Sequence, residues 1–145
     1  MTLLELIIAC AILLILSSAA LPIAKYTVIR QKEPELRRDL REMKDAIDRY
    51  KDTADRNQIR VEIGSEGYPP DLETLVKGVQ LGASSDRKIR FLRKVPVDPM
   101  TGQADWGLRA VQDDPDSTSW GGKNVFDVYS KSTGTALDGT KYSDW

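Results

Sequence analysis

Histidine is absent from the 145 residues, and Cys10 is the single cysteine. The missing histidine removes the commonest general acid or base, and one cysteine can form neither an internal disulfide nor a thiolate cluster. Because no paired nucleophile and base stands in their place, the sequence predicts a protein that is not an enzyme. The net charge is −1, so no overall basic field favours nucleic acid as a partner.

Charge is almost missing from residues 1–24, where Glu5 is the only charged side chain and no basic residue precedes Lys25. As a helix this stretch would extend about 36 Å, enough to cross a bilayer core of about 30 Å. A carboxylate in hydrocarbon costs about 2.5–3.5 kcal/mol on insertion scales and usually has a partner. Glu5 therefore either lies in the headgroup zone or has a partner within the apolar environment.

A secretory signal peptide is the rival interpretation of this apolar stretch. Such a peptide has a basic region before the apolar run and a small-residue cleavage site after it. Residues 17–20 could serve as the cleavage site, but nothing basic precedes the run and Glu5 would have no purpose. We favour the alternative in which Met1 is the first residue after processing, rather than an initiator.

An apolar stripe continues the helical pattern beyond the arm, with steps of three and four residues that place its members on one face. Its members are Leu36, Leu40, Met43, Ile47, Tyr50 and Ala54. Arg41 and Lys44 are expected on the opposite side, and Glu33 is expected to pair with Arg37 one turn along. The pattern predicts a single helix over residues 1–56, about 80 Å long.

Two prolines interrupt this helical pattern, at Pro22 and Pro34. Each removes a backbone donor, so the helix should bend at both points. The predicted organisation is an apolar arm (1–24), an amphipathic half of the same helix (25–56) and a small globular head (57–145).

The head is expected to contain a short helix, a turn-rich middle and two strands. Pro69, Pro70 and Asp71 should start the helix, and Gly78 should close it. Residues 106–111 and 125–130 alternate between apolar and polar, which predicts a small antiparallel sheet and an α+β fold. Loops are expected at 82–86, 96–102 and 113–122. The basic cluster of Arg87, Lys88, Arg90, Arg93 and Lys94 is expected on a solvated or subunit-contacting face.

Residues at both ends of the chain resemble one family. Thr2-Leu3-Leu4-Glu5-Leu6, followed by apolar residues up to Pro22, is similar to the N-terminus of mature type IV pilins and type II secretion pseudopilins. That family begins Phe-Thr-Leu-x-Glu, whereas this chain has Met1, and it has Leu14 where glycine is frequent. Residues 120–122, 125–130, 137–140 and 144–145 resemble the tail of the major pseudopilin branch.

The resemblance implies a pilin-like fold, in which the second half of a long bent helix packs against the small sheet. It implies a structural subunit that polymerises through its N-terminal helix into a type II secretion pseudopilus or a type IV pilus-like filament. The residues of processing and assembly would be Met1, with N-methylation of its amine, together with Glu5 and Pro22. In the filament, Glu5 would pair with the terminal ammonium of Met1 on an adjacent subunit.

Partners and location follow from the same resemblance. The subunit would be processed by a prepilin peptidase and held in the inner membrane, with its head in the periplasm. It would then join other pseudopilins on an inner-membrane assembly platform, and the filament would be periplasmic or extracellular. The alternatives are a monomeric membrane-anchored periplasmic binding domain and an adhesive or motility type IV pilin.

Major pseudopilins bind calcium in a C-terminal loop, so the resemblance also implies a possible calcium site in residues 130–144. Asp138 and Asp144 would be its carboxylate ligands, since calcium takes six to eight oxygens. Asp113, Asp114 and Asp116 form a denser alternative, and all five can instead be solvated turn residues.

Opposite charges are concentrated in two parts of the chain. Residues 25–60 carry eleven Lys or Arg against eight Asp or Glu, whereas residues 105–145 carry four against seven. The net charges of the two segments, +3 and −3, either favour contacts between subunits or are incidental.

Overall fold

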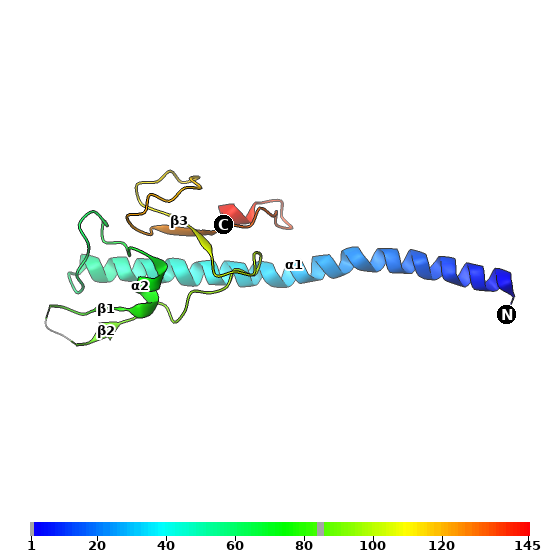
Figure 1. Cartoon of the computed structure of the whole chain (residues 1–145), viewed down its shortest axis with the longest axis horizontal. Coiled ribbons are helices and arrows are strands. Elements are labelled where there is room, and N and C mark those ends of the chain that lie inside the picture. The colour runs from blue at the N-terminus through cyan, green and yellow to red at the C-terminus, as the bar shows by residue number, and fades with distance from the viewer. Residues whose placement is uncertain (1, 84–85) are drawn as a thin grey trace.

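The computed structural model describes residues 2–83 and 86–145, so Met1 and part of the predicted loop at 82–86 lie outside the described residues. A helix, α1 (Leu3–Asp55), runs the length of the molecule, and the other elements lie along its second half (Figure 1). Its 53 residues correspond to about 80 Å. The prediction of one helix that continues from the apolar arm into the amphipathic half is confirmed.

Both prolines lie inside α1, and the helix continues through them. Pro22 and Pro34 each leave one carbonyl of the preceding turn without its usual donor. Near Pro22, the Ser18 hydroxyl donates to the Ile15 carbonyl at 2.7 Å, a side-chain bond that also favours bending. Figure 1 shows the N-terminal half of α1 gently curved, while the half beside the head is straighter.

The two halves of α1 differ in what covers them. Every residue from Thr2 to Val28 is exposed, and the first buried side chain is Leu36. From there the predicted stripe is buried, with no member more than 7% exposed. The face is wider than predicted, because Asp39, Ala46 and Thr53 are buried as well.

The short helix α2 (Leu72–Lys77) follows the two prolines as predicted. Its cap is Asp71, whose Oδ1 accepts a hydrogen bond from the Thr74 amide at 2.7 Å. Gly78 ends the helix with φ of 81°, and a Cβ there would lie 2.6 Å from the Ile89 carbonyl oxygen. Glycine is therefore required at this turn by both its backbone angle and its surroundings.

The predicted antiparallel sheet is present as one pair of strands, which gives the expected α+β fold, and a second, separate antiparallel pair accompanies it. Strands β3 (Trp106–Arg109) and β4 (Asp127–Ser130) lie within the two predicted segments and pair from Trp106 opposite Ser130. The second pair, β1 (Val79–Gln80) with β2 (Lys88–Ile89), was not predicted. Because each of these strands is two residues long, there is no alternating pattern to recognise.

The β3–β4 pair depends on a glycine. Gly107 lies opposite Tyr129, and a Cβ at position 107 would overlap the tyrosine ring. The ring is covered by the Arg109 guanidinium, whose central carbon lies 4.0 Å from the ring centroid. Arg109 also donates from Nε to the Ser117 carbonyl at 3.0 Å, which ties the polar loop after β3 to the sheet.

The core lies between the buried face of α1 and the head. Phe91 packs edge-on to Tyr50 of α1, with ring centroids 5.4 Å apart. The turn-rich segment 96–102 is attached by two buried bonds: Trp106 Nε1 donates to the Pro96 carbonyl at 2.9 Å, and Ser130 Oγ donates to Asp98 Oδ2 at 2.6 Å. A 3₁₀ turn, η1 (Tyr142–Asp144), ends the chain against β4 and α1.

Lys44 is not on a free side of α1, contrary to expectation. Its Nζ lies 3.1 Å from Asp127 Oδ1 on β4 and 3.0 Å from the Trp145 carbonyl oxygen. Arg41 is exposed, as predicted. Lys44 contacts the head because the head covers more of the circumference of α1 than the apolar stripe alone.

The buried stripe generates a test of the fold. Leu40→Ala should lower the free energy of unfolding of the full chain in detergent by about 2–5 kcal/mol, because Leu40 is only 3% exposed. Arg41→Ala, one residue away and exposed, should change it by less than about 0.5 kcal/mol. Denaturant unfolding followed by tryptophan fluorescence measures both. Equal losses would mean that α1 is enclosed on all sides.

Candidate functional site

Glu5 forms a capping box with Thr2 at the start of α1. The Glu5 amide donates to Thr2 Oγ1 at 3.3 Å, and the Thr2 amide donates to Glu5 Oε2 at 3.4 Å. These two bonds satisfy donors that the first turn of any helix leaves free. Glu5 therefore has a task within its own subunit, which the sequence analysis did not foresee.

The capping box leaves the negative charge of Glu5 uncompensated within the described part of the chain. Glu5 is exposed, and the carboxylate forms no ion pair among residues 2–83 and 86–145. The predicted partner, the Met1 ammonium, lies outside the described residues. Pro22 is exposed within α1 and contacts nothing in the head.

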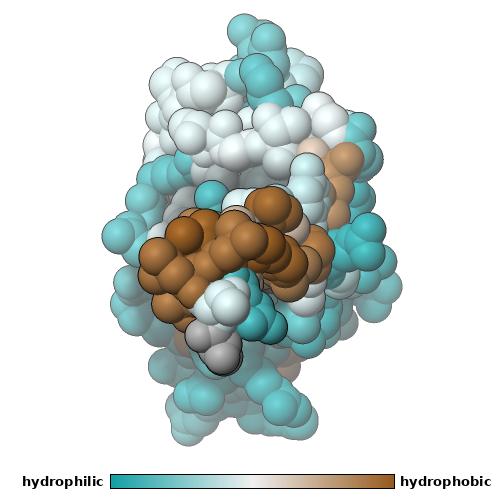
Figure 2. All heavy atoms as spheres, turned by 90° about the vertical axis from the view of Figure 1, so that its right-hand side faces the viewer, coloured by the Kyte–Doolittle hydropathy of each residue, from teal (hydrophilic) through white to brown (hydrophobic). Residues whose placement is uncertain are grey.

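The arm around Glu5 exposes a large apolar surface. Twelve Leu and Ile side chains between residues 3 and 23 are 49% exposed or more. Seen from the N-terminal end, they form a hydrophobic projection in front of a largely hydrophilic head (Figure 2). Full burial of one such side chain contributes about 1.5–3 kcal/mol, so the arm requires lipid or other helices around it. Within the described residues, α1 is the one helix that is both long enough and apolar enough to cross a membrane.

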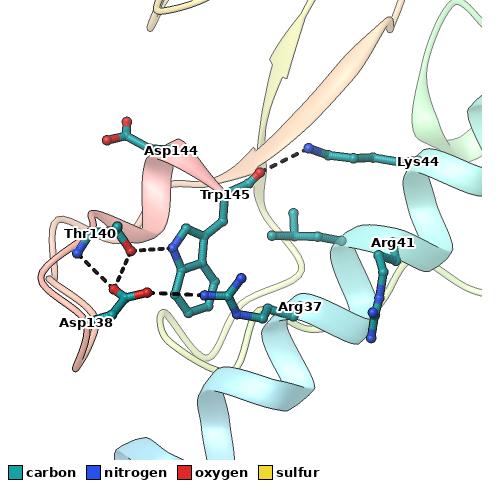
Figure 3. Close-up of a pocket in the computed structure, with 8 residues that line it drawn as sticks. Arg37, Arg41, Lys44, Asp138, Thr140, Asp144 and Trp145 are labelled. Atoms are coloured by element: carbon teal, nitrogen blue, oxygen red, sulfur yellow. Dashed lines mark hydrogen bonds and ion pairs between the residues drawn. The ribbon is translucent and has the colours of Figure 1, made fainter.

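The C-terminal segment is attached to α1 through three residues of that helix, and their contacts are shown in part in Figure 3. The Arg37 guanidinium lies 3.7 Å from the centroid of the Trp145 ring and 3.5 Å from Asp138 Oδ2. Lys44 bonds to the Trp145 carbonyl. The indole Nε1 of Trp145 donates to Thr140 Oγ1 at 2.7 Å, which closes the loop on itself.

Glu33 provides the third attachment, and it does so in place of the predicted local pair with Arg37. Its Oε1 accepts from the Leu137 amide at 2.8 Å and from the Tyr142 hydroxyl at 3.0 Å. Burial of Tyr142, together with the bond to Glu33, raises the pKa of the phenol above its usual value. The local ion-pair prediction fails because both side chains have partners across the fold.

Asp138 and Asp144, the predicted calcium ligands, do not present an open site. Asp138 Oδ1 accepts from the amide and hydroxyl of Thr140, and its Oδ2 faces Arg37. These bonds from Thr140, with the charge of Arg37, lower the pKa of the Asp138 carboxyl. Asp144 is exposed at the rim. Among the described residues, no group of three or more acidic, histidine or cysteine side chains could hold a metal ion.

In the alternative acidic loop, the carboxylate of Asp113 likewise accepts hydrogen bonds that hold a turn. Asp113 Oδ2 accepts from the backbone amides of Ala110 at 2.8 Å and Gly121 at 3.0 Å. These two bonds lower the pKa of the Asp113 carboxyl. Asp114 and Asp116 are exposed. Asp113 therefore closes the 110–121 loop, as the turn-residue interpretation expected.

A groove of about 450 Å³ lies between α1 and the C-terminal segment. Its α1 side consists of Leu40 and three cations, Arg37, Arg41 and Lys44 (Figure 3). Within the described chain, Arg41 has neither a hydrogen bond nor an ion pair, whereas the other two cations have partners. The five basic side chains of the 87–94 cluster are also exposed, and they lie directly before, on and after β2.

The sequence analysis did not bring the groove residues together. The available signal was the spacing of Arg37, Arg41 and Lys44, which places three cations on one helical face. This spacing does not indicate where Trp145 lies, because the position of Trp145 depends on the path of the whole C-terminal loop. No family model, curated protein or solved structure matches the chain. The function is therefore inferred from the geometry and from the resemblance of the N-terminal residues.

The lowered pKa of Asp138 predicts an acid dependence of stability. The folded carboxylate holds its proton less tightly than the unfolded one, so its contribution is complete above the unfolded pKa and is lost as the pH falls through the folded pKa. Asp138→Asn should therefore flatten the melting temperature profile between about pH 5 and pH 2. Asp116→Asn, at an exposed carboxylate that has no hydrogen bond or ion pair with the rest of the described chain, should retain the wild-type profile. Identical profiles for wild type and Asp138→Asn would contradict this role.

Calcium binding in the 130–144 loop stays a prediction, and it is directly testable. A calcium ion on Asp138 would have to displace Arg37, so binding should change the loop as well as its stability. At a hundredfold excess over Kd, binding to the folded state adds about 2.7 kcal/mol. The melting temperature of the full chain in detergent is measured with calcium and with chelator. If calcium binds in this loop, the wild type melts at a higher temperature with calcium than with chelator, and Asp138→Ala abolishes the difference. Equal melting temperatures of the wild type under the two conditions would exclude the site.

Proposed function

We propose that the chain is a structural subunit that polymerises through α1 into a type II secretion pseudopilus or a type IV pilus-like filament. The observation that carries this proposal is the division of one continuous helix into an exposed apolar arm and a half packed under a head. The proposal draws its family from the resemblance of residues 2–22. Subunits would be stored in the inner membrane, with their heads in the periplasm, before assembly.

The continuity of α1 favours assembly over simple anchoring. In a plain anchor, the arm and the head need no fixed geometry, and a flexible linker between them is sufficient. Here no loop separates the arm from the packed half, so the position of the arm determines the position of the head. Arms that pack side by side would therefore place the heads in a regular outer layer. Such a contact is heterologous and extends without closing.

The charge of Glu5 would set the register of the arms. Among apolar helices an unpaired carboxylate is strongly unfavourable, and removing one partner of a buried pair costs about 3–5 kcal/mol. Pairing with the Met1 ammonium of the adjacent subunit would satisfy both charges at one axial position. A slip by one helical turn would leave both unpaired.

The second candidate is a membrane-anchored monomeric domain facing the periplasm. The capping box favours it, because Thr2 gives Glu5 a role that needs no neighbouring subunit. A motility or adhesive pilin would share the assembly mechanism and differ in length and destination. Variants at residues 2 and 5 separate the capping role from the charge role.

Three variants separate the capping role of Glu5 from the role of its charge. Glu5→Gln keeps a side chain that can complete the capping box but removes the charge, and it should nearly abolish filaments. Thr2→Ala removes the cap but keeps the charge, and it should reduce stability of the first turn while filaments still form. Glu5→Leu removes both and should also abolish filaments. Filament yield is measured by electron microscopy, with membrane levels of the subunit as the control.

The charge role and the capping role of Glu5 predict opposite patterns of filament yield. If the charge pairs between subunits, Glu5→Gln behaves like Glu5→Leu. If capping is the only role of Glu5, Glu5→Gln behaves like wild type and Thr2→Ala carries the defect. Abundant, regular filaments from Glu5→Gln would therefore refute the pairing.

A further inference from the structure

The segment of α1 between the apolar arm and the buried stripe carries cations and no acid before Glu33. Residues 6–32 contain Lys25, Arg30 and Lys32 but neither Asp nor Glu. Lys25 and Arg30 are exposed, and Lys32 is partly buried. None of the three has a hydrogen bond or an ion pair with the described residues. These three residues are called the cationic collar below.

The distance between Glu5 and the cationic collar matches the thickness of a membrane. Residues 6–24 carry no charge, and as part of α1 they extend about 29 Å. The hydrocarbon core of a bilayer is about 30 Å thick, so with this stretch in the core Lys25 lies at its boundary. Lys32 lies about 10 Å further along the axis. Because side chains on a helix lean toward its N-terminus, those of Arg30 and Lys32 lean back toward the lipid phosphates.

Apolar surface adjoins the cationic collar. A shallow hollow of about 370 Å³ is lined by Ala24, Lys25, Val28 and Ile29. Tyr26 is 58% exposed, and its apolar ring with a polar hydroxyl suits the boundary between lipid and water. A molecule that matches this surface therefore has an apolar part beside an anionic part, which is the chemistry of an acidic lipid.

The acids that follow the cationic collar do not neutralise it by contact. Glu33 Oε1 faces the C-terminal segment, where it accepts from the Leu137 amide and the Tyr142 hydroxyl. Glu35 is exposed and forms no ion pair with Lys32, three residues before it. Within the described chain, the three cations of the collar thus remain open to an external anion.

We propose that the cationic collar binds the phosphates of anionic lipids, in the leaflet on the head side of the membrane. Lys25 and Lys32 are seven residues apart and share one face of α1, whereas Arg30 lies on another, so the collar meets phosphates on more than one side. These contacts hold the subunit at one depth in the bilayer. The proposal rests on the membrane storage of subunits in the proposed function, and it needs no filament.

An acidic surface on a neighbouring copy is the other candidate partner. Residues 105–145 carry a net charge of −3 and could face the collar in a filament. A hydrophilic surface would leave the apolar hollow uncovered, including Val28, which is 48% exposed. Lipid covers the apolar hollow and also pairs with the cations, so the observations favour lipid.

The lipid preference of the full chain in vesicles tests the cationic collar. The chain is reconstituted into phosphatidylcholine vesicles with a trace of either spin-labelled phosphatidylglycerol or spin-labelled phosphatidylcholine. Electron paramagnetic resonance measures the fraction of each labelled lipid that is held at the protein. The wild type should favour phosphatidylglycerol about fivefold, the effect of one cation at an anionic membrane surface. In 1 M salt, where the Debye length is about 3 Å, the preference should fall below about twofold.

Removing the three charges should remove the preference. The triple variant Lys25→Gln, Arg30→Gln, Lys32→Gln keeps polar side chains of good helix propensity, so α1 and its insertion should be retained. Circular dichroism and flotation with the vesicles check both. The variant should hold the two labelled lipids equally, to within about twofold, because each lost cation removes an attraction to the anionic lipid.

A matched triple variant controls for net charge. Arg60→Gln, Lys88→Gln, Lys94→Gln removes the same number of Lys and Arg from exposed positions of the head that have no partner in the described chain. Lys88 lies on β2, at the end of the molecule furthest from the arm (Figure 1). This control should keep the wild-type preference. Equal loss in both triple variants would assign the preference to net charge and overturn the collar.

The outcomes distinguish the cationic collar from the function on which it rests. A wild type that enters the vesicles without preferring phosphatidylglycerol, or a collar variant that keeps the preference, would overturn the collar alone. If the collar variant keeps the preference but loses filaments, its cations pair between copies instead. Failure of the wild type to enter vesicles would overturn membrane storage, and the filament yield of the wild type tests assembly separately.

Discussion

The apolar surface of the α1 arm cannot remain in water, and this constraint governs the rest of the molecule. Twelve exposed Leu and Ile side chains would each gain about 1.5–3 kcal/mol on full burial, a total that exceeds the stability of a typical domain. Lipid would satisfy this demand for a single chain, and the arms of neighbouring copies would satisfy it in the proposed filament. Because α1 continues without a break into the head, either environment also determines where the head is placed.

The head is small, and its attachment to α1 relies on polar contacts as well as on the buried stripe. Glu33, Arg37 and Lys44 each reach the C-terminal segment, which lies about a hundred residues away in sequence. They fasten the loop that would otherwise be free at the end of the chain. Arg37 and Lys44 also line the groove beside Arg41, which has no hydrogen bond or ion pair with the described residues. Thus the contacts that attach the C-terminal segment to α1 also shape this groove.

Much of the architecture was predictable because it depends on periodic or local signals. The stripe from Leu36 to Ala54 follows helical periodicity, and the strands at 106–109 and 127–130 lie within the two segments predicted from sequence alternation, although burial along the strands does not alternate. The pairing of β1 with β2 was missed because two-residue strands carry no period. The long-range contacts of Glu33 and Arg37 were not predicted, because their spacing in the sequence favours an ion pair between the two. In the fold, the path of the C-terminal loop brings Tyr142 to Glu33 and Asp138 to Arg37. The capping role of Glu5 agrees with a local signal as well, because Thr2 three residues earlier gives the spacing of a capping box.

Electron cryomicroscopy of material sheared from cells that produce the wild-type chain tests the central claim most directly. The account predicts helical filaments in which residues 2–28 pack against the same segment of neighbouring subunits at the axis, with the heads outside. Filaments whose axis holds anything other than these arms would contradict it. So would subunits found only as separate molecules in the membrane, at expression levels where assembly is possible.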